Sequence, residues 1–155
     1  MTRKLLIFLI TLIAFSSFIN ASSCGGNCPS GRCNYCPCGF LSKKIDIDKY
    51  CRSYPDWDFD CCKCIVELES KGNAHFCNGD PDIFRSNWKT GVLPIEDFSA
   101  QNYCDIKTQL VLCEEEANLK CAIKMFKKYG NSFENWYQSA AECQCRWLKG
   151  QIRSE

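Results

Sequence analysis

Two glutamates are the first candidates for general-acid catalysis in this sequence. Glu67 and Glu69 lie two residues apart in the run CKCIVELESKGN, whose apolar pattern predicts a helix. Residues two apart on a helix point about 200° away from one another, so these two cannot form a catalytic pair. We expect one to face solvent and Glu69, near the helix end, to face a cleft as a general acid. The alternative is that Glu69 is an ordinary surface residue.

Histidine and serine chemistry has little support. His75 is the single histidine, so a Ser/His/Asp or Cys/His mechanism would have to use it. No G-x-S-x-G motif accompanies it. The sequence therefore favours a structural, hydrogen-bonding role for His75.

The chain contains 15 cysteines in 155 residues, a density typical of a disulfide scaffold. Cys33-x-x-Cys36 and Cys61-x-x-Cys64 match zinc or redox spacings, but no histidine pair accompanies them. We predict disulfides, with no metal and no cofactor. Cys121 and Cys143 have the separation of cysteines that staple two helices, although their partners stay open. The odd number implies at least one thiol outside intramolecular bridges.

The N-terminal residues have the pattern of a removable leader. A basic start precedes an apolar run over 5–15 and small residues over 16–23, so we expect a signal peptide over 1–23. The protein is then secreted, or resides in the lumen of a secretory, phagosomal or lysosomal compartment. The 19 basic residues become 17 without Arg3 and Lys4, against 18 acidic ones. This net charge of −1 disfavours nucleic acid as a partner, and no apolar run predicts a membrane span.

The apolar periodicity predicts a mainly α domain with a short hairpin or loop region between helices. We expect a Cys-rich N-terminal segment over 24–40, one domain over 41–148 and a flexible tail over 149–155. The predicted helices cover 42–52, the run from an Asp58 cap to Gly72, 118–129, and a last helix from Asn131 with Glu134 as its capping-box partner. Residues 78–102 are predicted as loops with at most a short hairpin.

Three segments carry a resemblance to a known family. The run from Cys61 to Asn78, CCKCIVELESKGNAHFCN, resembles the segment of the lysozyme and lytic-transglycosylase superfamily in which a buried helix ends at a catalytic Glu-Ser. GVLPIE over 91–96 is similar to the family's Gly-Leu-Trp-Gln-Ile-Asn strand. NLKCAIKMF over 118–126, with the following Gly130 and Trp136, looks like its paired C-terminal helices. Small cysteine-rich secreted lysozyme-like proteins of unicellular eukaryotes are the most similar branch.

The resemblance implies a lysozyme-like α+β fold and an antibacterial glycoside hydrolase that cleaves β-1,4 bonds of peptidoglycan. Glu69 takes the place of the general acid. The implied substrate-binding residues are Ser70, Asn73, Trp88, Ile95 and Glu96. A second carboxylate would come from Asp82 or Asp97, with Glu96 also nearby, because Lys89 stands where the family strand has an acidic residue. We expect a monomer whose partner is the bacterial cell-wall glycan.

Two alternatives remain open. Pro94 and Glu96 replace the Gln and Asn of the family strand, which favours a catalytically impaired protein that binds wall glycan on the same fold. The pattern Cys61-x-x-Cys64 followed by helical cysteines also fits a saposin-like, membrane-active protein. Saposin-like chains carry fewer cysteines, so the glycan-directed functions are preferred.

Overall fold

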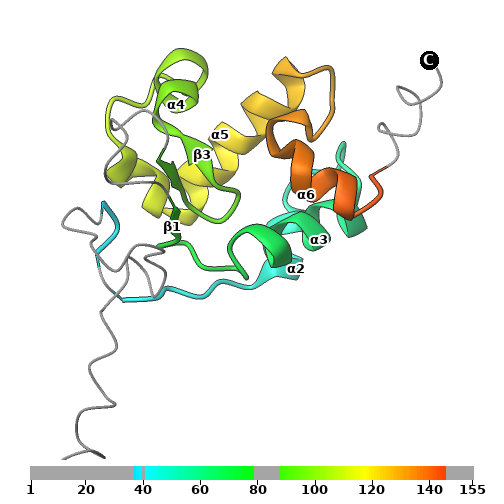
Figure 1. The fold of residues 1–155 in the computed structure, drawn as a ribbon, viewed down its shortest axis with the longest axis horizontal. Coiled ribbons are helices and arrows are strands. Elements are labelled where there is room, and N and C mark those ends of the chain that lie inside the picture. The colour runs from blue at the N-terminus through cyan, green and yellow to red at the C-terminus, as the bar shows by residue number, and fades with distance from the viewer. Residues whose placement is uncertain (1–36, 40, 79–87, 146–155) are drawn as a thin grey trace, which may run out of the picture.

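The computed structural model describes residues 37–39, 41–78 and 88–145. Within these ranges the protein is mainly helical, with a small antiparallel sheet, as the periodicity predicted (Figure 1). The predicted leader, most of the Cys-rich segment and the polar tail lie outside the described residues. So does Asp82.

Five α-helices and two short 3-10 helices are formed by the described residues. The α-helices are α2 (Ile47–Arg52), α3 (Phe59–Glu69), α4 (Asp97–Cys104), α5 (Glu115–Lys128) and α6 (Tyr137–Glu142), and the 3-10 helices are η4 (Gln109–Cys113) and η5 (Glu134–Trp136). None of them is long and apolar enough to cross a membrane.

Helix α3 forms as its sequence predicts. The Asp58 side chain caps the helix by accepting a hydrogen bond of 2.9 Å from the backbone N–H of Cys61. Cys62, Ile65 and Val66 then lie on its buried face. The helix ends at Glu69, because Lys71 and Gly72 both adopt positive φ angles that break the helical path.

The sheet has three two-residue strands, β1 (Cys77–Asn78), β2 (Lys89–Thr90) and β3 (Ile95–Glu96), in the order β1-β2-β3. All pairs are antiparallel, and Lys89 lies opposite Glu96. Figure 1 shows the sheet and α4 on one side of the molecule and α2, α3 and α6 on the other, with α5 extending between the two.

The polar side chain of Asn118 joins these two parts in the core. Asn118, fully buried on α5, accepts hydrogen bonds from the Tyr50 hydroxyl (2.8 Å) and the Leu93 N–H (3.1 Å). Its amide nitrogen donates to the carbonyls of Leu93 (3.1 Å) and Thr90 (3.4 Å). Gly91 makes this packing feasible, since a Cβ there would lie 2.1 Å from the Asn118 amide.

An aromatic and aliphatic core surrounds the Asn118 side chain. Its largest fully buried members are Trp136, Tyr50, Phe133, Ile65, Leu93, Ile95, Leu112 and Met125. Trp57, Phe126, Phe133 and Trp136 form a chain of ring contacts with centroids 5.0 to 6.1 Å apart. The core therefore takes large side chains from α2, α3, β3, η4, α5 and η5.

Three secondary-structure predictions were wrong. Helix α4 occupies 97–104, where loops were expected. The apolar pattern did not predict this helix, because its buried residues are the small Ser99, Ala100 and Cys104, while Phe98 is 63% exposed. The last helix does not begin at Asn131, which has a positive φ and no capping box with Glu134.

The third error concerns two helix starts. The helix predicted over 42–52 begins only at Ile47, because residues before the Asp46 cap are extended, with Lys44 bridged to Asn73. Helix α5 instead begins earlier than predicted, at Glu115.

Five disulfides join cysteines within the described residues: Cys38–Cys113, Cys51–Cys62, Cys61–Cys145, Cys64–Cys143 and Cys104–Cys121. The Cys61-x-x-Cys64 pair is thus structural, as predicted. Cys121 joins α5 to α4, and Cys143, directly after α6, joins that helix end to α3, so the two cysteines have different partners. Cys77 is a free, buried thiol, which agrees with the odd cysteine count.

Candidate active site

Glu69 is the last residue of α3 and is half-buried. Its Oε1 accepts a hydrogen bond of 2.5 Å from the Ser139 hydroxyl of α6, 70 residues further along the chain. Among the described residues, Ser139 is the one side chain that hydrogen-bonds this carboxyl group. Glu67, two residues earlier, is exposed, as the helical geometry predicted.

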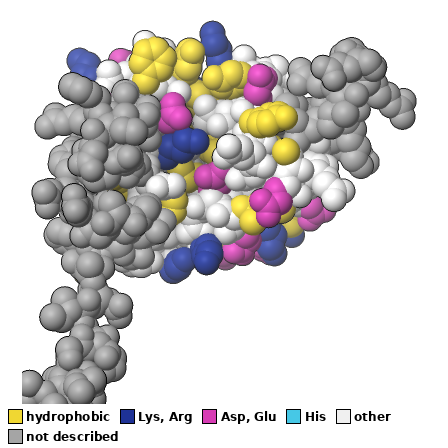
Figure 2. Space-filling view, viewed as in Figure 1, with side chains coloured by type: hydrophobic (Ala, Val, Ile, Leu, Met, Phe, Trp, Pro, Cys, Tyr) yellow, Lys and Arg dark blue, Asp and Glu magenta, His cyan; other side chains and the backbone are white. Residues whose placement is uncertain are grey.

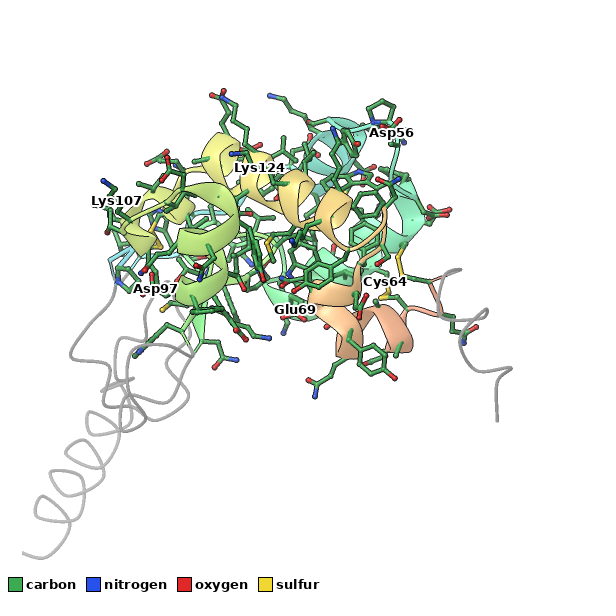
Figure 3. All side chains as sticks on the ribbon, turned by 90° about the horizontal axis from the view of Figure 1, so that it is seen from above. Asp56, Cys64, Glu69, Asp97, Lys107 and Lys124 are labelled. Carbon is green, nitrogen blue, oxygen red and sulfur yellow. A yellow bond between two sulfur atoms is a disulfide. The ribbon has the colours of Figure 1, made fainter. Side chains whose placement is uncertain are left out.

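Two disulfides join the helix that carries Glu69 to the residues directly after α6, and a third, Cys51–Cys62, joins it to α2. Cys61 and Cys64 of α3 bond to Cys145 and Cys143, directly after α6. Both bridges and the Glu69–Ser139 hydrogen bond join the same two elements, and α3 and α6 pack along one another. Figure 3 shows Cys64 and Glu69 beside α6. The position of the carboxyl group is therefore set by covalent bonds as well as by packing.

The turn after Glu69 is held by its own polar groups. Ser70 is buried, and its hydroxyl donates to the Val66 carbonyl across 3.3 Å. Asn73 is also buried, and its Oδ1 accepts from the backbone N–H groups of Lys43 (3.0 Å) and His75 (3.1 Å). These contacts give both side chains a structural role, and substrate binding by either stays a prediction.

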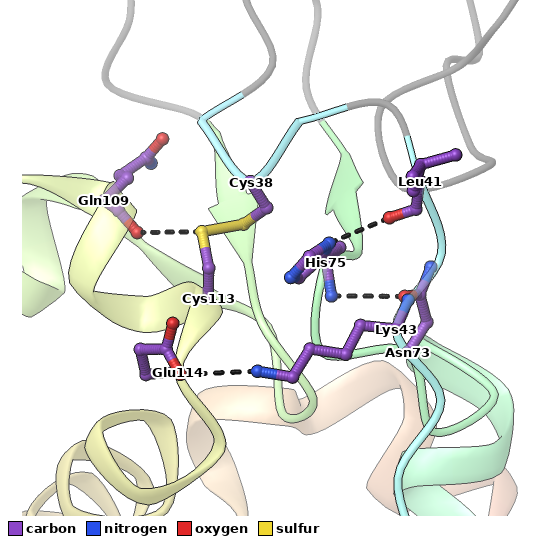
Figure 4. A network of polar contacts seen from close by, with 8 residues as sticks. All are labelled: Cys38, Leu41, Lys43, Asn73, His75, Gln109, Cys113 and Glu114. Atoms are coloured by element: carbon purple, nitrogen blue, oxygen red, sulfur yellow. Dashed lines mark hydrogen bonds and ion pairs between the residues drawn. A yellow bond between two sulfur atoms is a disulfide. The ribbon is translucent and has the colours of Figure 1, made fainter.

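An extended N-terminal segment, residues 41–45, passes alongside this turn (Figure 4). The Nδ1 of His75 lies 2.8 Å from the Leu41 carbonyl, the structural kind of contact expected for this histidine. The Lys43 ammonium pairs with Glu114 at 3.3 Å, next to the Cys38–Cys113 disulfide. The segment thus ties the Glu69 turn to the start of α5.

The strand position expected to supply a second carboxylate carries a cation. Lys89 of β2 and Glu96 of β3 are direct cross-strand neighbours, and their side chains form an ion pair at 3.8 Å. Glu96 is therefore already engaged by a positive charge. No contact of the described residues links it to Glu69.

Asp97 is half-buried at the start of α4 and accepts a hydrogen bond of 3.1 Å from Gln101. Figure 3 shows Asp97 and Glu69 clearly separated. The structure does not bring the predicted carboxylates together as a contacting pair, and Asp82 lies outside the described residues.

The other predicted binding residues are largely enclosed. Ile95 is fully buried, and Trp88 is 4% exposed, with its carbonyl accepting from Gln109 (2.9 Å). A ring this enclosed has almost no surface on which a sugar could stack. Tyr137 is 58% exposed on α6, while Trp136 is buried and donates to the Pro94 carbonyl (2.9 Å).

Side chains of both charges lie on the face seen in Figure 2. Acidic and basic side chains occupy its middle, and hydrophobic side chains lie near its top. The side chains drawn in colour on this face form no field of a single sign that would select a strongly charged polymer.

No protein-family model matches the chain, and no curated protein or solved structure shows significant similarity to it. The arrangement of Glu69, its hydrogen-bond partner and its disulfides is therefore the main basis for a functional conclusion.

Proposed function

We propose that this protein is a secreted, lysozyme-like glycoside hydrolase that cleaves β-1,4 bonds of bacterial peptidoglycan with Glu69 as its general acid. The observation that carries the proposal is the orientation of the half-buried Glu69 carboxyl by Ser139 at the end of a disulfide-bound helix. The five disulfides fit the oxidising compartment that such an enzyme requires.

The proposed chemistry assigns the two carboxyl oxygens different tasks. Oε1 is held by the Ser139 hydroxyl, which leaves Oε2 to deliver the proton in the proposed reaction. Glu69 donates this proton to the glycosidic oxygen as the bond from that oxygen to the anomeric carbon breaks. The resulting carboxylate then takes a proton from water, whose oxygen bonds to the anomeric carbon. The products are two shorter glycans, and Glu69 is again protonated.

One carboxylate must perform both proton transfers in this scheme. A second carboxylate opposite the acid ordinarily stabilises the positive charge that develops on the sugar ring. Lys89, which is paired with Glu96, offers no such stabilisation. We therefore expect slow turnover relative to glycosidases that use two carboxylates.

The test uses full-length oxidised protein and insoluble peptidoglycan, with release of soluble reducing sugars as the readout. Wild-type protein should release fragments and Glu69→Gln should not, because an amide cannot donate the acidic proton. Equal release by both proteins would remove Glu69 from the mechanism.

A second candidate is a wall-glycan-binding protein without catalysis. The Lys89–Glu96 ion pair and the buried Pro94, whose carbonyl is taken by Trp136, favour it. Retention on peptidoglycan without release of soluble fragments would support this function. The membrane-active alternative predicts leakage of a dye from liposomes, which neither glycan-directed function requires.

A further inference from the structure

A pocket of about 370 Å³ opens between α4, η4 and α5, separate from Glu69. Figure 3 shows Lys124, one of its lining residues, on the side of α5 that faces away from Glu69. Small-molecule sites commonly have volumes of about 300 to 1,000 Å³, so this pocket is large enough for a ligand. It is lined by Cys104, Ile106, Val111, Ala117, Lys120, Cys121, Ile123 and Lys124.

The spacing of residues on α5 produces the pocket. Ala117, Lys120, Cys121 and Lys124 follow the i, i+3, i+4, i+7 pattern and therefore share one face of the helix. Ala117 leaves room there because its side chain is a single methyl group. The Cys104–Cys121 disulfide joins α4 to α5 at a Cα–Cα distance of 5.3 Å. The pocket is thus covalently braced before any ligand arrives, which lowers the ordering cost of binding.

Its lining combines aliphatic side chains with two exposed lysines. Ile106, Ile123 and Val111 provide aliphatic walls, and Val111 is 39% exposed. Lys120 is paired with Glu116 at 2.6 Å. Lys124 is exposed and forms no ion pair with any residue the structure describes. The site therefore suits an apolar molecule that carries a single negative group.

We infer that this pocket binds a medium-chain fatty acid, with the alkyl chain among the aliphatic side chains and the carboxylate at Lys124. An alkyl chain matches the walls, since the two exposed lysines are the only strong hydrogen-bonding side chains among the described lining residues. A carboxylate matches Lys124, which forms no ion pair within the described residues. This inference does not depend on Glu69 or on glycan cleavage.

Isothermal titration calorimetry with decanoate tests the inference on the full oxidised protein. We expect saturable binding, and no comparable binding of decyltrimethylammonium, which has the same chain and the opposite charge. Lys124→Gln should weaken decanoate binding about fivefold, the effect of one partly exposed ion pair. Lys127→Gln is the matched control, because Lys127 lies over Tyr54 and does not line the pocket.

Ala117→Phe provides a steric test, because the ring would fill the space above the methyl group. It should abolish decanoate binding while the circular dichroism spectrum stays that of the wild type. High salt should reduce the difference between wild-type protein and Lys124→Gln, since salt screens an exposed ion pair. Absence of saturable decanoate binding, or equal binding of the cationic analogue, would overturn the inference. So would full binding by a folded Ala117→Phe variant.

Discussion

The Ser139 hydroxyl donates a hydrogen bond of 2.5 Å to Oε1 of Glu69 and so connects the end of α3 to the middle of α6. The same two helices are joined by the Cys64–Cys143 disulfide. Oε1 is thereby occupied, and Oε2 is the oxygen left for substrate. The relationship makes Ser139 a positioning residue for the proposed acid.

Removing the Ser139 hydroxyl should lower the turnover number on peptidoglycan. We expect Ser139→Ala to lose about tenfold in kcat, because the hydrogen bond to the carboxylate that forms as Glu69 releases its proton contributes about 1.5 kcal/mol. The melting temperature should change by only a few degrees. Ser139→Thr should recover much of the loss, since it restores the hydroxyl. Ser53→Ala, which removes an exposed serine hydroxyl bonded to Lys49, is the control. A Ser139→Ala enzyme with unchanged kcat and pH profile would refute the positioning role.

Loss of Asn118 should destabilise the whole fold. Asn118→Ala leaves the Tyr50 hydroxyl and the Leu93 backbone groups buried without their partner. Each such group costs about 1 to 3 kcal/mol, so we expect a loss of roughly 3 kcal/mol or more in the free energy of unfolding. Chemical denaturation measures this loss. Asn102→Ala, at an exposed asparagine of α4, should change stability by less than about 0.5 kcal/mol. Similar values for both variants would contradict the assigned role of Asn118.

The disulfides should contribute different amounts to the free energy of unfolding, because they close loops of different lengths. Cys38–Cys113 spans 75 residues and Cys104–Cys121 spans 17. Loop entropy predicts that replacing the first pair with serines costs about 1 kcal/mol more than replacing the second. Denaturant titration of the two double-serine variants provides the comparison. A larger loss from the shorter loop would show that native-state packing, rather than loop length, determines the difference.

The free thiol should be unreactive in the folded protein. Burial raises the pKa of the Cys77 thiol from 9.0 to about 11, and the Thr90 hydroxyl contacts its sulfur at 3.9 Å. At pH 8, iodoacetamide should therefore modify Cys77 only after unfolding. Peptide mapping by mass spectrometry with and without denaturant checks this. Rapid labelling of Cys77 in the native protein would contradict its burial.

The same pKa shift gives a dependence of stability on pH. The folded protein keeps the Cys77 proton that the unfolded chain releases near pH 9. The folded state thus binds more protons between about pH 9 and 11, so this thiol should lower stability as the pH rises through that window. Cys77→Ala should reduce the alkaline loss of stability in denaturant titrations. An identical pH profile for both proteins would assign the loss to other groups.

Local signals predicted some elements well. Asp58 and Gly72 bracket α3 because a cap and a helix-breaking glycine act within a few residues of their own position. Helix α4 was not predicted, because its buried residues Ser99, Ala100 and Cys104 do not produce a helical period of large apolar side chains. Periodicity thus identifies helices that bury large side chains and misses those that bury small ones.

The candidate site was predictable only in part. Glu69 was selected because its run resembles a family segment that ends at a catalytic glutamate, and the helical angle predicted only that Glu67 and Glu69 face different ways. Ser139 could not be found, because it lies 70 residues away and only the packing of α6 on α3 brings it to the carboxyl group. For the same reason, no local pattern identified Cys143 as the partner of Cys64.

The most direct test of the account compares Glu69→Gln with Glu67→Gln in the release of soluble reducing sugars from peptidoglycan. The two substitutions make the same chemical change two residues apart on α3, at a half-buried and an exposed glutamate. We predict that Glu67→Gln keeps wild-type release and that Glu69→Gln loses it while still folding. Release by Glu69→Gln at the wild-type rate would contradict the account.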